Sequence, residues 1–380
     1  MPKPKKVTLI ATTAMGLESI VAKEVKGLGY EDVTVENGRV RYEADLSAIP
    51  RSNLWLRSAD RVKLVIGEFK ATTFDDLFEQ TKALPWENYI PEDGSVPVIG
   101  KSVKSTLYSV RDCQSIVKKA IVERMRKMYG LASRIEESGP EHKVEIAIHK
   151  DHALLTMDTS GAGLHKRGYR TGQGEAPLKE TMAAALVQLT NWRPDEPFVD
   201  PFCGSGTIPI EAALIGQNIA PGFNREFASE SWDFIPYNLW ENAFNEAEEA
   251  ANYDQELNIT GLDVDGRMIA TAKANAIEAG LGDLISWKQM QVKDFNPKEK
   301  NGYIVGNPPY GERIGDQEEV EQMYKDFGLI MRDHPSWSVY VITSNEKFEK
   351  LYGLPATKRR KLYNGFIKID YYQYFGKKES

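Results

Sequence analysis

The clearest pattern in the chain is Phe198-Val-Asp-Pro-Phe-Cys-Gly-Ser-Gly-Thr207, in which an apolar strand runs into a glycine-rich turn and then a helix. Gly204 and Gly206 lack a Cβ atom, so the backbone there can approach a ligand closely and adopt dihedral angles that other residues avoid. The amides of the following helix would favour a negatively charged ligand group, and Asp200 could accept from a cationic amine. The missing third glycine and the missing Lys-Ser/Thr argue against a dinucleotide fingerprint and a phosphate loop. We therefore predict a ligand site here, with a purely structural turn as the alternative.

Strands and helices alternate regularly on both sides of this turn. Such alternation predicts a doubly wound parallel sheet, which binds its ligands at the carboxyl ends of the strands. The end of the chain differs, because Asn364-Gly365 separates two strand-like runs and predicts an antiparallel hairpin. Residues 161–380 are thus expected to form a Rossmann-like α/β domain whose sheet ends in that hairpin. The strands are expected at 197–200, 258–263, 285–290, 303–307 and 338–343, and the helices at 178–190, 207–216, 266–279 and 318–332.

Acidic residues follow the next two predicted strands. Asp263 ends an apolar run that starts at Ile259, and a carboxylate there can accept from both hydroxyls of a ribose. Asp265 also fits as the N-cap of the next helix. Asp294 follows the third strand and could accept from an adenine amine. These positions predict a nucleoside site beside the glycine-rich turn.

The run Asn307-Pro-Pro-Tyr310 ends the fourth predicted strand. Its two prolines hold the backbone extended and free the carbonyls from internal pairing. The side-chain oxygen of Asn307 and the carbonyl of Pro308 can both accept from one amino group, and Tyr310 offers a ring on which a base can stack. We predict that Asn307, Pro308, Pro309 and Tyr310 form the catalytic loop, with a structural turn as the alternative.

Two smaller α/β modules precede this domain. Residues 1–66 show the order β-α-β-β-α-β, with Asn37-Gly38 as a hairpin turn, which is typical of a ferredoxin-like fold. Residues 67–160 form a second module, which contains a long basic helix at 114–128 and ends in a strand pair. We therefore expect three domains with boundaries near residues 66 and 160.

The charge of the chain is unevenly distributed. The net charge is −7, yet residues 101–134 hold nine Lys or Arg against two acidic residues. A locally positive surface is compatible with RNA binding, because phosphate contacts depend on the local field. A merely solvated helix face is the alternative. The side chains expected to contact RNA are Lys101, Lys104, Arg111, Lys118, Lys119, Arg124, Arg126 and Lys127.

The composition is that of a globular protein, with 41% hydrophobic and 27% charged residues. No apolar run approaches the length of a membrane span, and no cleavage pattern follows the N-terminus. Cys113 and Cys203 lie far apart in the sequence and support neither a disulfide framework nor a metal cluster. We expect a cytoplasmic protein without a metal and without a membrane partner, and the sequence leaves the oligomeric state open.

These motifs together resemble class I methyltransferases that modify amino groups of RNA bases. The glycine-rich turn and Asn307-Pro-Pro-Tyr-Gly-Glu-Arg313 carry most of the resemblance. The best match is the bacterial 23S rRNA guanine-N2 methyltransferase family in its single-activity form, since a second methyltransferase domain would need a longer chain. Further similar segments are Leu164–Arg170 and Ala176–Glu180 for the start of the catalytic domain, Asp112–Ala120 for a THUMP domain, and Met15–Glu18 and Asn53–Arg57 for the ferredoxin-like domain.

The resemblance implies S-adenosylmethionine as cofactor and RNA as partner, with 23S rRNA favoured and tRNA possible. It implies that Asp263 holds the ribose, that Asp294 holds the adenine, and that Asn307 to Tyr310 hold the guanine whose N2 amine takes the methyl group directly. A covalent cysteine route is not expected, because Cys203 lies in the cofactor loop. The residues implied for that loop are Asp200, Pro201, Phe202, Cys203, Gly204, Ser205, Gly206 and Thr207.

Three alternatives stay open. A tRNA guanine-N2 methyltransferase with the same modules would carry the same motifs. An RNA-binding assembly factor would keep the fold without the activity, although the two complete motifs argue against it. A DNA adenine methyltransferase fits less well, because the N-terminal modules resemble RNA-binding domains.

Overall fold

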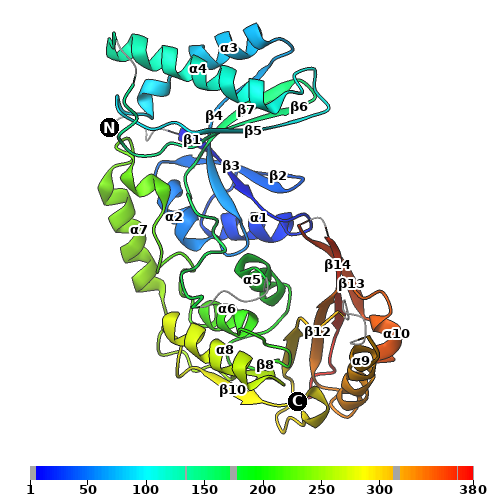
Figure 1. Cartoon of the computed structure of the whole chain (residues 1–380). Helices are drawn as coiled ribbons and strands as arrows, with labels where there is room; N and C mark the ends of the chain where they lie inside the picture. The colour runs from blue at the N-terminus through cyan, green and yellow to red at the C-terminus, as the bar shows by residue number, and fades with distance from the viewer. Residues whose placement is uncertain (1–5, 133–134, 172–177, 311–316, 366, 380) are drawn as a thin grey trace.

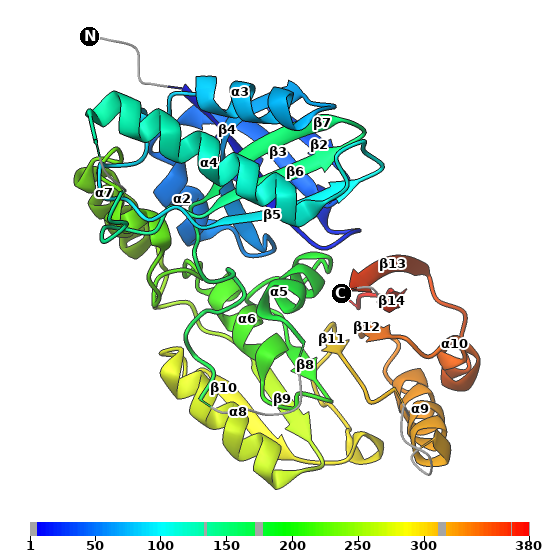
Figure 2. The same cartoon turned by 45° about the horizontal axis from the view of Figure 1, so that its top comes forward.

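The computed structural model describes residues 6–132, 135–171, 178–310, 317–365 and 367–379. Two seven-stranded sheets, each with its own helices, make up this part of the chain (Figures 1 and 2). None of the described helices is long and apolar enough to cross a membrane. Parts of the predicted motifs lie outside the described residues, namely Arg134, Ala176, Pro177 and Gly311 to Arg313.

The N-terminal sheet joins both smaller modules in the order β2-β3-β1-β4-β7-β6-β5. Antiparallel pairing prevails in it, and the exception is the parallel pair β5 and β6. The predicted β-α-β-β-α-β order of the first module is confirmed, with helices α1 (Glu18–Gly27) and α2 (Ala48–Trp55). The strands are β1 (Lys6–Thr12), β2 (Val33–Glu36), β3 (Arg39–Asp45), β4 (Arg61–Lys70), β5 (Val98–Val103), β6 (Val144–His149) and β7 (His152–Asp158).

The ten-residue strand β4 is what makes the two modules continuous. Its first half pairs with β1, and it pairs with β7 from Lys63 to Lys70, with an irregularity between Val65 and Gly67. The sequence predicts the two modules separately and gives no sign of a shared sheet. The boundary that we predict near residue 66 falls inside this strand and stays a prediction.

Helices α3 (Phe74–Ala83) and α4 (Val110–Tyr129) pack on the β5 side of this sheet (Figure 1). A capping box of Thr73 and Asp76 starts α3, and the Ser109 side chain caps α4. Gly130 ends α4 in the left-handed conformation, at φ 66°. Apolar side chains spaced three or four residues apart make up the buried face of α4: Cys113, Val117, Ala120, Ile121 and Met125.

The C-terminal sheet has the order β10-β9-β8-β11-β12-β14-β13. Its first five strands are parallel, and β14 runs antiparallel to β12 and forms a hairpin with β13. The predicted Rossmann-like sheet with a terminal antiparallel hairpin is therefore confirmed. The strands are β8 (Phe198–Asp200), β9 (Ile259–Asp263), β10 (Ile285–Gln289), β11 (Tyr303–Gly306), β12 (Ser338–Thr343), β13 (Lys358–Asn364) and β14 (Ile367–Tyr374).

Helices cover both faces of this sheet, which is why β8, β11 and β12 are buried along their whole length. One apolar cluster lies under α5, α6 and α8, and another lies under α9 and α10. These helices are α5 (Glu180–Gln188), α6 (Thr207–Gly216), α8 (Gly266–Glu278), α9 (Gln317–Arg332) and α10 (Phe348–Tyr352). Short 3-10 helices among the described residues are η1 (Trp86–Asn88), η2 (Ala228–Ser231) and η3 (Val292–Asp294).

The acidic segment of residues 225–256, between α6 and β9, packs on the N-terminal half through its helix and two tryptophans. Its helix α7 (Tyr237–Ala250) lies along α2, and Trp232 and Trp240 belong to the apolar core of the N-terminal sheet. Glu246 accepts two hydrogen bonds from Arg51, each at 2.8 Å. This segment therefore fixes the two halves of the molecule to each other.

A buried ion pair also joins the two halves. Arg167 and Glu211 have side chains that are 2% and 0% exposed, and their N···O distance is 3.2 Å. Arg167 donates in addition to the carbonyl of Arg57 at 2.6 Å, and Tyr169 donates to Glu211 at 3.0 Å. Buried charges are tolerated when they are paired and hydrogen-bonded in this way. The contact places the N-terminal module directly above α6, the helix that follows the glycine-rich turn.

Candidate active site

Polar side chains from three neighbouring strands meet at the carboxyl edge of the C-terminal sheet. Strand β8 pairs with β9 through Asp200 and Gly261, and with β11 through Val199 and Ile304. Because the strands are parallel, Asp200, Asp263 and the loop after Gly306 emerge at the same edge. The structure thus brings together the three motifs that the sequence places at strand ends.

The two glycines of the turn differ in what surrounds them. At Gly206, with φ 85°, a Cβ atom would lie 2.7 Å from the Trp287 ring and 2.9 Å from the Cβ of Ala272. At Gly204, with φ 51°, no atom lies within 4 Å of a Cβ position. Gly206 therefore lets the turn pack against the sheet, whereas Gly204 leaves open space where a ligand can approach the backbone.

Two anchors of this turn were not predicted as functional. Arg170 donates to the Thr207 hydroxyl at 3.1 Å, to Ser205 Oγ at 3.4 Å and to the Leu178 carbonyl at 2.8 Å, and it pairs with Glu180. Arg170 is the last residue of the segment Leu164–Arg170, which resembles the start of the family's catalytic domain. Its contacts with the turn could not be predicted, because Ser205 and Thr207 lie 35 and 37 residues away in the sequence.

Asn275 is the second anchor and comes from α8. It is 2% exposed and donates to the Ser205 carbonyl at 2.9 Å. Its own oxygen accepts from the amide and the hydroxyl of Thr171, each at 3.0 Å. The signal that could have identified it is an asparagine on the buried face of a predicted helix, since a buried amide needs polar partners.

Asp200 is a deeply buried carboxyl group, with a 1% exposed fraction. One of its oxygens accepts from the Phe202 amide at 3.0 Å. Burial raises the pKa of Asp200 well above its ordinary range, and the charge of Asp263 acts in the same direction. A cation bound in front of this carboxyl would relieve that cost, so Asp200 is suited to face a positively charged ligand group.

Asp263 is held by two backbone amides. Its Oδ2 accepts from Gly204 at 3.0 Å and its Oδ1 from Asp265 at 2.9 Å. Each carboxylate oxygen has a further lone pair, so two hydroxyl groups can still donate to it. The side chain of Asp265 caps α8, as the sequence suggests. Val264, which is 60% exposed, adds an apolar surface for a flat ring at the same edge.

Asp294 lies one strand further along this edge, at the end of η3 after β10, and its side chain is exposed. Its assignment to an adenine amine stays a prediction. Cys203 is buried, and burial raises the pKa of its thiol. A thiol held in its neutral form is a poor nucleophile, which agrees with the expectation that no cysteine forms a covalent intermediate.

The Asn307–Tyr310 loop lies directly beside Asp200. A Cβ atom on Gly306, which precedes the loop, would be 3.6 Å from Asp200 Oδ1 and 3.0 Å from the Phe202 ring. Within the loop, the Tyr310 hydroxyl donates to Asn307 Oδ1 at 2.6 Å. Tyr324 of α9 donates to the Pro309 carbonyl at 2.6 Å and so fixes the loop to the helix. Asn307 and Tyr310 are half-buried, Pro308 is buried and Pro309 is exposed.

The basic residues expected to bind RNA divide into two groups. Lys118 pairs with Glu137 at 2.6 Å, Lys101 with Glu145 at 3.1 Å, and Arg124 with Glu87. Arg126 is half-buried and donates to the Ala132 carbonyl at 3.0 Å. The others are exposed, one in the turn after β5 and three on α4: Lys104, Arg111, Lys119 and Lys127.

These cations lie far from the carboxyl edge, since α4 is at the end of the molecule opposite the C-terminal sheet in both views (Figures 1 and 2). Their role in RNA binding stays a prediction. Within the described ranges, no group of three or more His, Cys, Asp or Glu is placed to hold a metal ion.

Comparison with known proteins adds a family context. Models of three protein domains match the chain: an RlmL ferredoxin-like domain over residues 8–63, a THUMP domain over 71–158, and an RMKL-like methyltransferase domain over 167–373. YpsC of Bacillus subtilis (strain 168), which is named as an RNA methyltransferase, is 65% identical over 98% of this chain and 97% of its own length.

Two further relatives are informative. Ribosomal RNA large subunit methyltransferase K/L of Pseudomonas putida (strain GB-1) is 34% identical over 94% of this chain, which spans 51% of that protein's length. The crystal structure of SMU.472, named as a methyltransferase and complexed with SAH, is 48% identical with a TM-score of 0.95. That match covers 99% of this chain and 100% of the other chain.

Proposed function

This chain belongs to the family of THUMP-domain RNA methyltransferases related to large subunit methyltransferase K/L, and from this premise we propose that it methylates the N2 amine of a guanosine in 23S rRNA. It is an S-adenosylmethionine-dependent methyltransferase, as the family and the SAH-bound relative indicate. The proposal concerns the substrate: the base is guanine, the methylated atom is its N2 nitrogen, and the RNA is 23S rRNA.

The observation that carries the proposal is the position of Asn307 beside the buried carboxyl of Asp200. Gly306 brings the first residue of the catalytic loop next to Asp200, at the same sheet edge as the glycine-rich turn in which Gly204 leaves open space. A base amine held by Asn307 would therefore lie close to the methionine end of a cofactor bound at the turn. Direct transfer needs this proximity and alignment more than it needs an acid or a base.

The residues present fit S-adenosylmethionine. Gly204 provides a space that a Cβ would enter, Asp263 has lone pairs for two ribose hydroxyls, and Asp200 is suited to a cationic group. When bound, this cofactor supplies a methyl group that is already activated on a sulfonium. Arg170 and Asn275 then act by holding the turn in its shape.

The catalytic loop acts on the acceptor. Asn307 Oδ1 accepts from the Tyr310 hydroxyl at 2.6 Å, and this contact supports a role of the oxygen as a hydrogen-bond acceptor. We expect the guanine N2 amine to donate to it in the complex, so that the nitrogen lone pair faces the methyl group. The Tyr310 ring would stack on the extruded base. The displaced proton leaves the N2 nitrogen after transfer, and water can take it up.

Nucleoside analysis by mass spectrometry tests this function. Large-subunit rRNA, tRNA and DNA are compared between a deletion strain and the same strain complemented with the wild-type protein or with Asn307→Ala. We expect N2-methylguanosine to be reduced in the deletion strain's 23S rRNA and restored by the wild-type protein only. A loss confined to tRNA, a change in DNA N6-methyladenine, or no change in any nucleoside would each contradict the proposal and would favour one of the three alternatives.

A further inference from the structure

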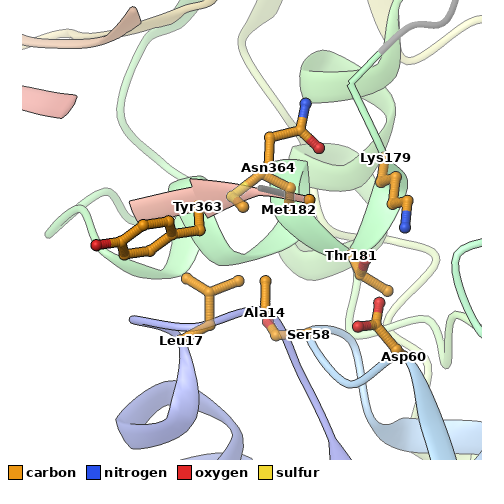
Figure 3. Close-up of a pocket in the computed structure, with 10 residues that line it drawn as sticks. Ala14, Leu17, Ser58, Asp60, Lys179, Thr181, Met182, Tyr363 and Asn364 are labelled. Carbon is orange, nitrogen blue, oxygen red and sulfur yellow. The ribbon is translucent and has the colours of Figure 1, made fainter. Parts of the chain in front are cut away.

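A cavity of about 130 Å³ lies where three parts of the chain meet (Figure 3). The N-terminal module contributes Ala14, Leu17 and Asp60, and the first turn of α5 contributes Thr181 and Met182 together with the preceding Lys179. The tip of the β13–β14 hairpin closes it with Asn364. None of these residues belongs to the cofactor turn or to the catalytic loop, and no part of the proposed function uses them.

The cavity lies at the same edge of the C-terminal sheet as the active site. Strand β12 ends at Thr343, which pairs with Asp370, and β14 continues beyond that point back to Ile367 and the hairpin tip. On the other side, Arg170 ties the start of α5 to the cofactor turn, because it contacts both Glu180 and Thr207. The cofactor turn, the catalytic loop and this cavity therefore lie at the same edge of the sheet, along which an RNA strand that delivers a base to Asn307 can run.

The lining combines an apolar floor with a polar rim. Leu17 and Met182 are 1% and 4% exposed, and with Ala14 they form a surface on which a flat ring can lie. Asp60 and Lys179 converge on one side, where the Asp60 carboxyl lies beside the Thr181 hydroxyl, and Asn364 lies above (Figure 3). Among the residues that the structure describes, no salt bridge within 4 Å engages Asp60.

The size of the cavity selects a single ring system. An engineered protein cavity of about 150 Å³ accommodates benzene, so a space of this order suits one nucleobase and not a stacked pair. The charges at the rim favour a base that offers an N–H donor to Asp60 and a phosphate that approaches Lys179. A protein that extrudes a target base leaves the neighbouring bases partly unstacked, and a second pocket can hold one of them.

We propose that this cavity binds one amino-bearing nucleobase of the RNA substrate, adjacent to the nucleotide that is methylated. Asp60 accepts from the edge of that base, Leu17, Met182 and Ala14 pack against its face, and Lys179 contacts a neighbouring phosphate. The inference rests on the proposed function in that it takes RNA as the substrate. It adds a second base-binding site, contributed jointly by the ferredoxin-like module, α5 and the hairpin.

Two variants test the site in different ways. Ala14→Leu fills the cavity without removing a polar group, and Asp60→Asn keeps the shape while weakening the acceptor. The matched control is Asp32→Asn, which neutralises an exposed carboxylate of the same module. The probe is deproteinised large-subunit rRNA from the deletion strain, and the measurements are the RNA Kd, single-turnover methylation, the Kd for S-adenosylmethionine and the Tm.

We expect both cavity variants to weaken RNA binding and kcat/KM by about tenfold, the scale of removing one stacked base. Cofactor affinity and Tm should match those of the wild-type protein, and Asp32→Asn should match it in every measurement. If both cavity variants bind and methylate RNA like the wild-type protein, the cavity is only a gap between the two halves. If instead the wild-type protein itself leaves the RNA unmethylated, the proposed function fails, and the two failures are thus distinguishable.

A nucleotide-level experiment identifies the base. Once the methylated guanosine is mapped, each neighbouring nucleotide of a transcript is replaced by uridine, which has no exocyclic amine. At one position, the uridine replacement should lower kcat/KM for the wild-type protein. The same replacement should have no additional effect in Asp60→Asn, because that variant lacks the carboxylate that accepts from the base. Additive effects of the RNA change and the protein change at every neighbouring position would overturn the assignment to Asp60.

Discussion

The carboxyl edge of the C-terminal sheet and the basic helix α4 of the N-terminal sheet represent two ways of presenting polar groups. At the sheet edge, side chains and backbone amides hold one another in fixed positions, as Asp263 does with the amide of Gly204 at 3.0 Å. On α4, the cations are spread around the helix, and Lys118 and Arg124 are engaged in ion pairs with acidic residues of the same module. The first arrangement can position a small ligand, whereas the second can only attract a polyanion.

The comparison shows how far a function can be inferred from the charges in a sequence. The sequence between residues 101 and 134 has a large excess of basic residues, but the structure neutralises part of it internally. The Arg124 hydrogen bond lowers the pKa of Glu87, as expected for a carboxylate committed to its partner. By contrast, the single carboxylates at the sheet edge keep their position because parallel strands end together. Counting charges therefore overestimates the number of cations without an acidic partner, while strand-end positions correctly predict which polar side chains meet at the sheet edge.

The largest effect is expected at the catalytic loop. Asn307→Ala should lower kcat by about 10²-fold or more, because it removes a positioned contact that matters most in the transition state. The affinity for S-adenosylmethionine should stay unchanged. Single-turnover methylation of the same RNA measures the effect, with Tyr310→Phe as the control, since that variant keeps the stacking ring and should stay within a few-fold of the wild-type rate. An active Asn307→Ala variant would contradict the assigned role.

A substitution on the cofactor side of the sheet edge should change the affinity for S-adenosylmethionine. Asp263→Ala should weaken binding of S-adenosylmethionine by about 1–3 kcal/mol, the cost of leaving the ribose hydroxyls without an acceptor. Asp265→Ala is the matched control, because that side chain caps α8 and should affect stability by about 1 kcal/mol with little effect on affinity. Calorimetry with both variants distinguishes the two carboxylates, and equal affinities for all three proteins would contradict the ribose assignment.

Asp200 should make stability depend on pH. Its pKa is raised in the folded protein, so the folded state holds the proton more tightly than the unfolded chain does. The free energy of unfolding should then fall as pH rises from the ordinary carboxyl range up to the raised pKa. Asp200→Asn removes this pH-dependent decrease, so the variant should gain stability relative to the wild-type protein as the pH increases.

Urea unfolding of the cofactor-free protein between about pH 4 and pH 8 measures this difference, and cofactor affinity should fall in the same variant. Such a result would show that the active site retains a carboxyl group at a cost in stability. A stability difference between the two proteins that does not change with pH would contradict the assignment.

The sequence predicts the C-terminal domain well because its signals are local. Several of its strands end at or just before a polar residue, and Gly204 and Gly206 mark the turn before any contact is known. Arg170 and Asn275 were not predicted, because their role depends on contacts with Ser205 that cross 35 and 70 residues of sequence. The shared N-terminal sheet was missed for a similar reason. Strand β4 has the length to pair on both sides, but sequence patterns do not indicate its second partner.

The smallest effects are expected on α4, where cations in ion pairs can be compared directly with cations that face solvent. Replacing Arg111, Lys119 and Lys127 by Gln should weaken RNA binding and make the dependence of log Kd on log salt shallower, by roughly 0.7–0.9 for each phosphate that the protein no longer neutralises.

The matched control is the pair Lys118→Gln and Arg124→Gln, whose cations are already paired with Glu137 and Glu87. These two should change the salt dependence less and should lower stability by about 0.2–1 kcal/mol each, as ion pairs near the protein surface do. Filter binding with large-subunit rRNA at several salt concentrations decides the matter. If both sets of variants change the salt dependence equally, the ion pairs open when RNA binds, and if neither set changes it, α4 is only a solvated helix and the RNA contacts lie elsewhere on the protein.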